Sequence, residues 1–549
     1  MQKKRYQMIA AICALSLCVI SCGNTTELNE AVNAAVKESE LFSDRDLSGE
    51  YDAAACDSIT LSDAGCTTDS KNVTIDKSVV TITGEGDYIL NGTLRDGRIV
   101  VDVEKSEKVQ LVLNGVDVTS STSAAIYVKS ADKVFITLAD GTNNTLANGG
   151  TFVAVDDNNI DAVIFSKDDL TLNGTGGLSV KSPAGHGIVS KNDLVITNGT
   201  YEITASSHGI TGKDSVAVAD GNYRITAGKS AIKSVNDDDL TQGSVSVTGG
   251  TFTLSAGTDG INAMNEINIL DGKIVIAECN EGLEARVINL SGGEIEITAQ
   301  DDGLNATDKR TDPDVASAAD AKNTQEKIID QADVKDNFRG GRGGMDQSHS
   351  EASINISGGL ISIDAEGDGV DSNGYFYMSG GELYVTGPTS GGNGALDYDI
   401  EASISGGIVV AAGQSGMAQN FGSDSTQGAI LVNTQEQNAA GSDIVLLDSE
   451  GKELLARTIH KRYNSVVVSC PEIKDGNSYT VMTGDRSTAV TMEGLIYGEN
   501  IGFGGAKQGF KKGERPEGTP EAPEMKSGER PEGMPKAPEM KNCERPKVM

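Results

Sequence analysis

The chain has 549 residues, a formal net charge of −35, 66 glycines and no tryptophan, and aromatic residues make up only 4% of it. Such an acidic excess excludes the basic footprint of a nucleic-acid-binding protein, and the shortage of aromatic residues disfavours a large globule packed around them. The composition favours many short strands joined by tight turns.

Residues 1–21 have the pattern of a lipoprotein signal peptide. Lys3, Lys4 and Arg5 precede a short apolar stretch, and the small residue Ser21 stands directly before Cys22. Cleavage there would leave Cys22 to be lipidated, and the alternative is an ordinary secretory signal with a chance cysteine. No other segment is apolar enough to span a bilayer. We therefore expect an exported protein that contacts the cell membrane through a lipid anchor only, on the extracellular face.

The segment after the signal peptide, residues 22–43, is polar and is expected to be a flexible tether. Cys56 and Cys66 follow in a turn-rich region, where they could form a disulfide or remain as two thiols.

Residues 44–424 carry a repeat that predicts an all-β fold, a right-handed parallel β-helix. The repeat centres on a short phrase of an acidic residue or glycine, Gly or Ala, an aliphatic residue and a residue with a side-chain oxygen, which occurs in five copies that begin at Asp259, Glu281, Asp302, Asp368 and Gly394. The base period is near 22 residues. Each period also holds two alternating strands around a small glycine turn, which gives three strands per coil. The right hand is expected from the usual chirality of parallel crossovers. The Gly or Ala of the phrase is found at Gly187, Gly209, Ala231, Gly260, Gly282, Gly303, Gly369 and Ala395.

Three segments depart from this repeat. Residues 307–350 are polar and are expected to form a mobile insertion. Residues 425–500 predict a small antiparallel β unit that caps the solenoid and covers its edge. Residues 501–549 repeat a Pro-, Glu- and Lys-rich unit, a composition typical of disorder.

The repeat stacks carboxylates upon carboxylates. Neighbouring coils of a solenoid lie about 4.8 Å apart, where two unit charges repel by roughly 3.5 kcal/mol at an effective dielectric near 20. Such a ladder calls for a cation, and hard oxygen ligands point to Ca²⁺. The alternative is that Asp-Gly and Asn-Gly serve as turns without metal, although Glu281 and Glu284 are poor turn formers. The candidate ligands are Asp259, Asn262, Glu281, Glu284, Asp301, Asp302, Asn305, Asp368, Asp371 and Asp397.

The geometry of this ladder stays open in the sequence. The first and last residues of each phrase are three apart, and residues three apart on a strand normally point to opposite sides. The two acidic columns therefore form either one site or two separate ones.

A basic column precedes the ladder. Lys191 and Lys213 each follow the aliphatic residue of their phrase by three, and Lys233 falls in register with Asn262. These ammonium groups would suit a polyanionic sugar, and the alternative is a solvated polar face. His186 and His208, one period apart, are expected to stack in a corner ladder rather than bind metal.

Two sets of tyrosines have different expected places. Tyr201 and Tyr223 share a register with Phe252 and are expected in the core. Alternation instead directs three others outward, where they either stack on sugar rings or are solvent-facing strand formers. These three are Tyr375, Tyr377 and Tyr384.

Several stretches resemble a known family. They are the segments Val109–Val116, Ser123–Val128, Lys229–Ser234, Glu281–Ala285 and Asp301–Asn305. Together they resemble the bacterial cell-surface carbohydrate-binding β-helix proteins of cellulolytic clostridia, over roughly residues 43–500. This resemblance implies a right-handed parallel β-helix with bound calcium that is similar to β-helix pectate lyases but binds cellulose and polygalacturonate without cleaving them. It also implies calcium ligation at the phrases of Glu281 and Glu284 and of Asp302 and Asn305.

Three functions follow as hypotheses. The leading one is a non-catalytic, calcium-dependent surface lipoprotein that binds an acidic or cellulosic plant cell-wall polysaccharide. The second is a calcium-dependent polysaccharide lyase with Lys233 as the base. The third is a structural surface stalk. The absence of tryptophan makes a neutral glucan less expected than pectin.

Overall fold

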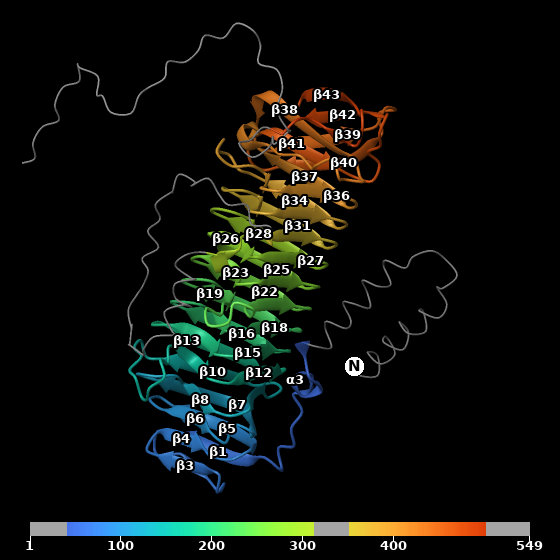
Figure 1. Cartoon of the computed structure of the whole chain (residues 1–549). Coiled ribbons are helices and arrows are strands. Elements are labelled where there is room, and N and C mark those ends of the chain that lie inside the picture. The colour runs from blue at the N-terminus through green and yellow to red at the C-terminus, as the bar shows by residue number, and fades with distance from the viewer. Residues whose placement is uncertain (1–40, 312–350, 501–549) are drawn as a thin grey trace, which may run out of the picture. The chain divides into compact units, whose positions relative to one another are not determined.

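The computed structural model describes residues 41–311 and 351–500. The predicted signal peptide with Cys22, most of the predicted tether, most of the insertion and the C-terminal tail lie outside these residues. In the described residues the chain is almost entirely β and winds into a parallel β-solenoid of about eleven turns (Figure 1). The predicted fold class is confirmed. Among residues 41–311 and 351–500, no helix has the length and apolar character needed to cross a bilayer.

Each full coil contributes one strand to each of three walls. The first wall is a separate 13-stranded sheet. Its strands are β3 (Val73–Asp76), β4 (Val79–Ile82), β6 (Arg98–Asp102), β8 (Ile126–Ser130), β11 (Ala162–Ser166), β14 (His186–Ser190), β17 (Ile210–Gly212), β20 (Ile232–Ser234), β23 (Asp259–Ala263), β26 (Glu281–Ala285), β29 (Leu304–Ala306), β32 (Val370–Ser372) and β35 (Leu396–Tyr398).

The second wall follows the first along each coil. Its strands are β5 (Gly86–Leu94), β7 (Lys108–Ser120), β9 (Lys133–Leu138), β12 (Asp169–Gly174), β15 (Asp193–Ile196), β18 (Ser215–Val218), β21 (Ser244–Val247), β24 (Glu266–Ile269), β27 (Val287–Leu290), β30 (Ser353–Ile356), β33 (Tyr375–Met378) and β36 (Glu401–Ile404).

The third wall completes the coil. It shares a 27-stranded sheet with the second wall, because β7 pairs with strands of both. Its strands are β10 (Asn143–Asn148), β13 (Gly177–Ser182), β16 (Thr200–Ala205), β19 (Asn222–Ala227), β22 (Thr251–Ala256), β25 (Lys273–Cys279), β28 (Glu294–Ala299), β31 (Leu360–Ala365), β34 (Glu382–Thr386) and β37 (Ile408–Gly413).

The core is built from aliphatic columns inside the coil. Ile188, Ile210, Ile232, Ile261 and Leu283 stack in register along the first wall and are at most 1% exposed. Parallel stacking places like side chains about 4.8 Å apart, so each column packs continuously.

The glycine of the phrase keeps this interior tightly packed. A Cβ at Gly282 would lie 2.2 Å from the carbonyl oxygen of Gly303 and 2.6 Å from Cγ2 of Ile297. Only glycine, or alanine where a coil has more room, therefore fits at this position.

Aromatic residues stack inside the third wall as predicted. The ring centroids of Tyr201 and Tyr223 are 5.2 Å apart, and those of Tyr223 and Phe252 are 4.5 Å apart. Phe376 and Met378 point inward, as the alternation of their strand required.

Short antiparallel pairs close the N-terminal end of the solenoid. β1 (Asp57–Ser62) pairs with β2 (Thr67–Thr68), and β3 pairs with β4. Cys56 and Cys66 are free thiols in the structure, so the open question about their pairing is answered in favour of two thiols.

The predicted cap is present at the C-terminal end. β37 pairs antiparallel with β41 (Tyr463–Ser469), which pairs with β38 (Ala429–Asn438) and so covers the edge of the third wall. The short strand β44 (Ile496–Tyr497) adds to β38, and the 3₁₀ turn η2 (Ser415–Met417) precedes the cap. A four-stranded antiparallel sheet completes it, formed by β39 (Ser442–Leu447), β40 (Glu453–Ile459), β42 (Ser478–Thr483) and β43 (Arg486–Thr491).

An N-terminal strap, residues 41–50, lies on the outer side of the second wall. It contains the short helix α3 (Asp44–Ser48), whose N-cap Ser43 and Asp46 form a capping box. Phe42 is buried against Val195 and Ala217, and the buried carboxylate of Asp46 pairs with Lys133 at 2.7 Å. Residues 41–43, which the sequence assigned to the tether, therefore belong to this packed strap.

Candidate metal centre

The polar residues of the phrase form two registered columns on the first wall. Column 1 contains Asp259, Glu281, Asp302 and Asp368, and column 2 contains Lys233, Asn262, Glu284, Asn305, Asp371 and Asp397. This confirms that Lys233 shares the register of Asn262. Four consecutive coils thus carry one member of each column, and the coils of Lys233 and Asp397 at either end carry a member of column 2 only.

A local irregularity of the backbone brings the two columns together. The N–H groups of two successive residues, Gly282 and Leu283, both donate to the next coil, to the carbonyls of Asp302 and Gly303. In a regular strand successive N–H groups point in opposite directions. The chain therefore bends between Glu281 and Glu284, and both side chains reach the same outer side. Carboxylates of the two columns therefore lie together in shared clusters and not on opposite sides of the wall.

The first of these sites is cluster 1, formed by Asp259, Glu281 and Glu284. Carboxylate oxygens of all three lie within 4.8 Å of one another. The amide of Asn262 donates to Glu284, and that of Asn305 donates to Glu281 at 3.1 Å. The three carboxylates come from β23 and β26, so the cluster joins two adjacent coils.

Burial dominates the electrostatics of cluster 1. Burial, with the charges of Glu284 and Asp259, raises the pKa of Glu281 to about 9. Burial and the charge of Glu284 also raise the pKa of Asp259, although the Ser230 hydroxyl donates to it at 2.9 Å. Without a cation these carboxylates are held close together at a free-energy cost.

Cluster 2 consists of Asp302, Asp368 and Asp371, again with carboxylate oxygens within 4.8 Å of one another. The backbone N–H of Asp368 donates to Asp302 at 2.6 Å, and that of Gly394 donates to Asp368. These bonds orient the carboxylates of Asp302, in the turn before β29, and of Asp368, in the turn before β32.

The pKa values of cluster 2 are raised as well. Burial, followed by the charge of Asp301, raises the pKa of Asp302 to about 7. Burial, followed by the charge of Asp302, raises the pKa of Asp368 to about 8. Burial also raises the pKa of Asp371 well above its ordinary value. The structure therefore holds two groups of mutually repelling carboxylates on one wall.

Both clusters fit a hard divalent cation. The atoms that could coordinate a metal are carboxylate and amide oxygens, which calcium prefers over nitrogen or sulfur. Asn305 lies between them, and its Oδ1 atom is buried with no hydrogen-bond partner. Cys279 nearby is not a competing ligand, because burial raises the pKa of its thiol to about 12. The unpartnered amide oxygen is the atom that a bound cation would satisfy.

Two predicted ligands lie beside the clusters rather than within them. Asp301 is partly exposed and acts on cluster 2 through its charge. Asp397 accepts a hydrogen bond from Gln419 at 2.5 Å, and burial, followed by the charge of Asp399, raises its pKa to about 6. Asp397 stands one coil beyond Asp371 in column 2.

The predicted basic residues separate into different settings. Lys233 stands in column 2, one coil before Asn262, and burial lowers its pKa despite the opposing charge of Asp259. Lys213 is paired with Asp238. Lys191 lies with its Nζ 5.3 Å from the ring centroid of Phe165. Lys233 is therefore the member of this set that adjoins the acidic ladder.

His186 and His208 stack on the two coils that come before the coil of Ser230, which in turn comes before Asp259, the first acidic residue of column 1. Their ring centroids are 5.1 Å apart and nearly parallel. The backbone N–H of His208 donates to Nδ1 of His186 at 3.2 Å, and that of Ser230 donates to Nδ1 of His208 at 3.1 Å. Each Nδ1 is therefore an acceptor engaged in the corner ladder.

The three outward tyrosines do not share one surface. Tyr375 and Tyr377 lie on β33 of the second wall with their ring centroids 5.5 Å apart, and Tyr377 is 36% exposed. Tyr384 lies on β34 of the third wall, where the guanidinium of Arg457 covers its ring at 4.0 Å.

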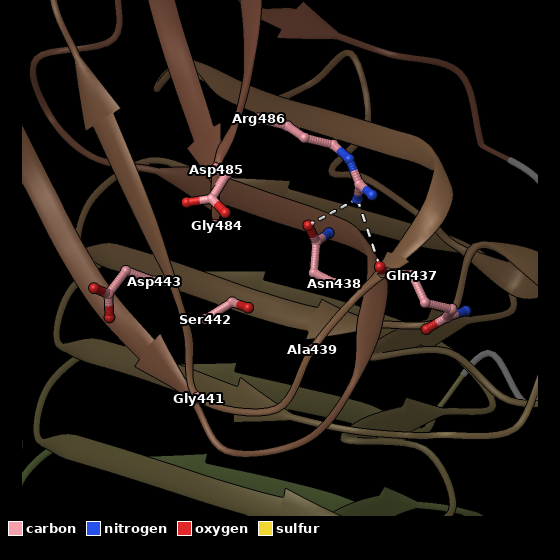
Figure 2. Close-up of a pocket in the computed structure, with 9 residues that line it drawn as sticks. All are labelled: Gln437, Asn438, Ala439, Gly441, Ser442, Asp443, Gly484, Asp485 and Arg486. Carbon is pink, nitrogen blue, oxygen red and sulfur yellow. Dashed lines mark hydrogen bonds between the residues drawn. The ribbon is translucent and has the colours of Figure 1, made fainter.

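A polar pocket of about 540 Å³ lies in the cap, between the loop before β39 and the turn before β43 (Figure 2). Arg486 donates to Asn438 at 3.2 Å across it, and Ser442 and Asp485 also line it. It shares no residue with either cluster.

Sequence reasoning missed Lys309, which forms an ion pair with Glu284. Lys309 follows Asn305 by four residues, outside the repeat, and no periodic signal marks it. Its approach to cluster 1 depends on how the chain leaves the coil.

Comparisons with known proteins find one family, one curated relative and one solved structure that are similar to this chain. The family model of carbohydrate-binding domain-containing proteins matches residues 76–311 and 278–394, more than half of the chain. A carbohydrate-binding domain-containing protein of Acetivibrio thermocellus is 42% identical over 135 residues, which are 24% of this chain and 47% of that protein. The chain thus spans about half the length of this relative.

One solved structure is also similar, that of the polysaccharide lyase-like protein from C. thermocellum as a gadolinium derivative. It is 35% identical, has a TM-score of 0.41, and covers 43% of this chain and 97% of its own. On the extent of the family match, the chain belongs to the family of carbohydrate-binding domain-containing proteins.

Proposed function

We propose that this protein binds plant cell-wall polysaccharide in a calcium-dependent manner and does not cleave it. The observation that carries the proposal is the pair of three-carboxylate clusters on the first wall. The ammonium of Lys233 stands on the same wall, in column 2, one coil before Asn262. The family match supports carbohydrate as the ligand class.

In this proposal the carboxylates of both clusters, with Asn305, hold Ca²⁺. Bound calcium would neutralise the ladder and offer open coordination positions to sugar carboxylates. Lys233, one coil away, would bind a further carboxylate of the same chain. Acidic residues without calcium would repel a polyuronate, so binding requires the ion.

The calcium step is tested by calorimetric titration of the metal-free full chain and by its melting temperature. We expect calcium to release or absorb heat and to raise the melting temperature, and chelator to reverse both. A protein indifferent to calcium and to chelator would refute the metal proposal.

The glycan step is tested by pull-down on insoluble polygalacturonate with calcium or with chelator. We expect retention with calcium only, and a loss of retention in Lys233→Ala. Lys273→Ala is the matched control, because Lys273 forms an exposed ion pair with Glu294 on the third wall. Equal retention of the wild type in chelator would contradict calcium-dependent binding.

A polysaccharide lyase is the second candidate, because burial lowers the pKa of Lys233 as a catalytic base requires. Lys233 would take the proton α to the uronate carboxylate, at C5, the glycosidic C4–O bond would break to leave a C4–C5 double bond, and the departing sugar oxygen would take a proton from water. Calcium held by the clusters would make the α proton more acidic. Ultraviolet absorbance of unsaturated product from polygalacturonate measures this activity. Product that forms with the wild type but not with Lys233→Ala would replace the binding proposal.

A third candidate, separate from the calcium-dependent one, is a neutral, cellulosic ligand bound without calcium on the flank with Tyr375 and Tyr377, whose rings stack with centroids 5.5 Å apart. The outward strand positions around this pair carry no Lys or Arg. They include a row of hydrogen-bonded amides, in which Asn289 donates to Asn268 at 2.8 Å and Asn355 donates to Asn289 at 2.9 Å. Tyr377→Ala should weaken retention on cellulose even in chelator, whereas Leu360→Ala on the third wall should not. Those outward positions are Glu266, Asn268, Val287, Asn289, Ser353, Asn355, Tyr375, Tyr377, Glu401 and Ser403.

Export and lipidation at Cys22 are part of the proposal. Cys22→Ser should abolish the incorporation of radiolabelled fatty acid and release the protein from the membrane fraction. Unchanged membrane association of Cys22→Ser would contradict the lipid anchor.

A further inference from the structure

Lys309 places an ammonium group on cluster 1. It belongs to the 3₁₀ turn η1 (Lys309–Thr311), and its Nζ pairs with Oε1 of Glu284. The Glu284 side chain is 6% exposed, whereas that of Lys309 is 51% exposed. The ammonium therefore enters the cluster from the solvent side, while the carboxylate is fixed in the wall.

A second set of ion pairs fixes the turn that carries Lys309. Arg310 donates to both oxygens of Asp308, each at 2.8 Å, and also pairs with Glu351. Arg286, which directly follows β26, donates to the carbonyl of Glu351 at 3.4 Å. Bidentate pairing of this kind orients a backbone segment as well as neutralising charge. Lys309 is thus held over cluster 1 by its immediate neighbour in sequence.

Cluster 2 differs in this respect. Within residues 41–311 and 351–500, no Lys or Arg forms an ion pair with Asp302, Asp368 or Asp371. Backbone N–H groups are the donors that reach its carboxylates. The two clusters therefore have the same number of carboxylates but different counter-charges.

We propose that Lys309 is an internal counter-cation of cluster 1, which a divalent cation must displace from Glu284 in order to bind. The inference rests on the proposed calcium binding. Two cations at one carboxylate oxygen repel each other strongly at these distances. Calcium therefore binds cluster 1 more weakly than cluster 2, and Lys309 sets the difference.

The same ammonium has a role when calcium is absent. It offsets the repulsion among Asp259, Glu281 and Glu284, so cluster 1 stays compact in the metal-free protein. Cluster 2 has no Lys or Arg partner among the described residues, and backbone N–H groups reach its carboxylates instead. Calcium should consequently add less stability at cluster 1, which already has a counter-charge, than at cluster 2.

The test compares calcium titrations of the full chain by calorimetry in the wild type, Lys309→Met and the control Lys273→Met. We expect two classes of site in the wild type. Lys309→Met should tighten one class by at least about tenfold, as removal of a neighbouring unit charge predicts, and leave the other unchanged. In a Glu284→Gln background, Lys309→Met should have no effect. Equal affinities in the wild type and Lys309→Met would overturn the inference while calcium binding stands.

A chelator arm separates this inference from the proposed function. Without calcium, Lys309→Met should melt at a lower temperature than the wild type, and Lys273→Met should not. If neither the wild type nor any variant binds calcium, the proposed function fails. The role of Lys309 as a counter-cation is then decided by the melting temperatures in chelator alone. Equal melting temperatures of wild type and Lys309→Met in chelator would then overturn it.

Discussion

Glu281 and Glu284 are three residues apart on one strand, yet their carboxylate oxygens lie within 4.8 Å of each other. The bend at Gly282, where successive N–H groups donate to the same neighbouring coil, makes this possible. The bend recurs at Gly303 and Leu304, where both N–H groups also donate to the next coil. It is therefore a property of the repeat, and it converts two columns of acidic residues into sites that join adjacent coils.

The first prediction concerns alkaline pH in the absence of calcium. The pKa values of Asp397, Asp302, Asp368 and Glu281 are raised to about 6, 7, 8 and 9. A carboxyl whose pKa is raised by folding contributes stability that is present below its unfolded value and is lost as pH rises through the folded value. The melting temperature in chelator should therefore fall as pH rises from the unfolded carboxyl values, about pH 4, to the highest folded value, about pH 9.

Scanning fluorimetry across this pH range checks the prediction. Calcium should remove most of the fall, because a bound cation stabilises the charged carboxylates. A melting temperature in chelator that rises over the same interval would contradict the electrostatics of both clusters.

The second prediction separates the two clusters. Glu284→Gln should abolish calcium stabilisation at cluster 1, and Asp371→Asn should abolish it at cluster 2. A site at 100 times its dissociation constant contributes about 2.7 kcal/mol, so each change should remove about that much of the calcium effect on unfolding. Denaturant unfolding with and without calcium measures it.

Glu294→Gln is the matched control, because Glu294 lies exposed on the third wall and pairs with Lys273. The double variant Glu284→Gln/Asp371→Asn should show no calcium effect. A full effect in the double variant would place the ion elsewhere.

The third prediction concerns the histidine ladder at acidic pH. Burial lowers the pKa of His208 to about 2, and nearby Lys233 adds to the shift. An imidazole with a lowered folded pKa contributes stability that is present above its unfolded value and is lost as pH falls below it. The wild type should therefore lose about 1.4 kcal/mol per pH unit below pH 6.5 from this residue.

His208→Asn tests this, because an amide oxygen can still accept the N–H of Ser230. In calcium, this variant should lose less stability than the wild type between pH 6.5 and pH 5. Parallel curves for the two proteins would refute the assignment.

The fourth prediction concerns the strap. Asp46→Ala removes the N3 half of the capping box with Ser43 and leaves Lys133 without its carboxylate, which should destabilise the fold by about 2 to 4 kcal/mol. Limited proteolysis should then cut within residues 41–50, whereas Asp44→Ala, an exposed acidic residue of the same turn, should leave this segment protected. Equal protection of both variants would show that the capping box and ion pair are dispensable.

Local sequence signals were sufficient for the repeat and for its register. The 22-residue spacing predicted three strands per coil, and the alignment of Lys233, Asn262 and Glu284 follows from counting residues. The inward place of Tyr201 and Phe376 follows from alternation along one strand. These features depend on the period of the repeat, which can be read directly from the amino-acid sequence.

The strap and Lys309 were not predictable in this way. Phe42 packs against residues more than 150 positions away, and Asp46 pairs with Lys133 on another coil. Arg457 reaches Tyr384 from the cap. Each contact joins segments that carry no common period, so its existence depends on how the coils stack.

The sequence by itself determined that acidic residues stack on one wall of a parallel β-solenoid, because a constant period places like residues one above another. The tertiary structure decided that Asp259, Glu281 and Glu284 converge, since a bend in the strand sets the direction of each side chain. It also decided that Lys309 enters this cluster while cluster 2 has no ammonium partner in the described residues. Direction and long-range approach depend on the folded backbone and cannot be obtained from spacing alone.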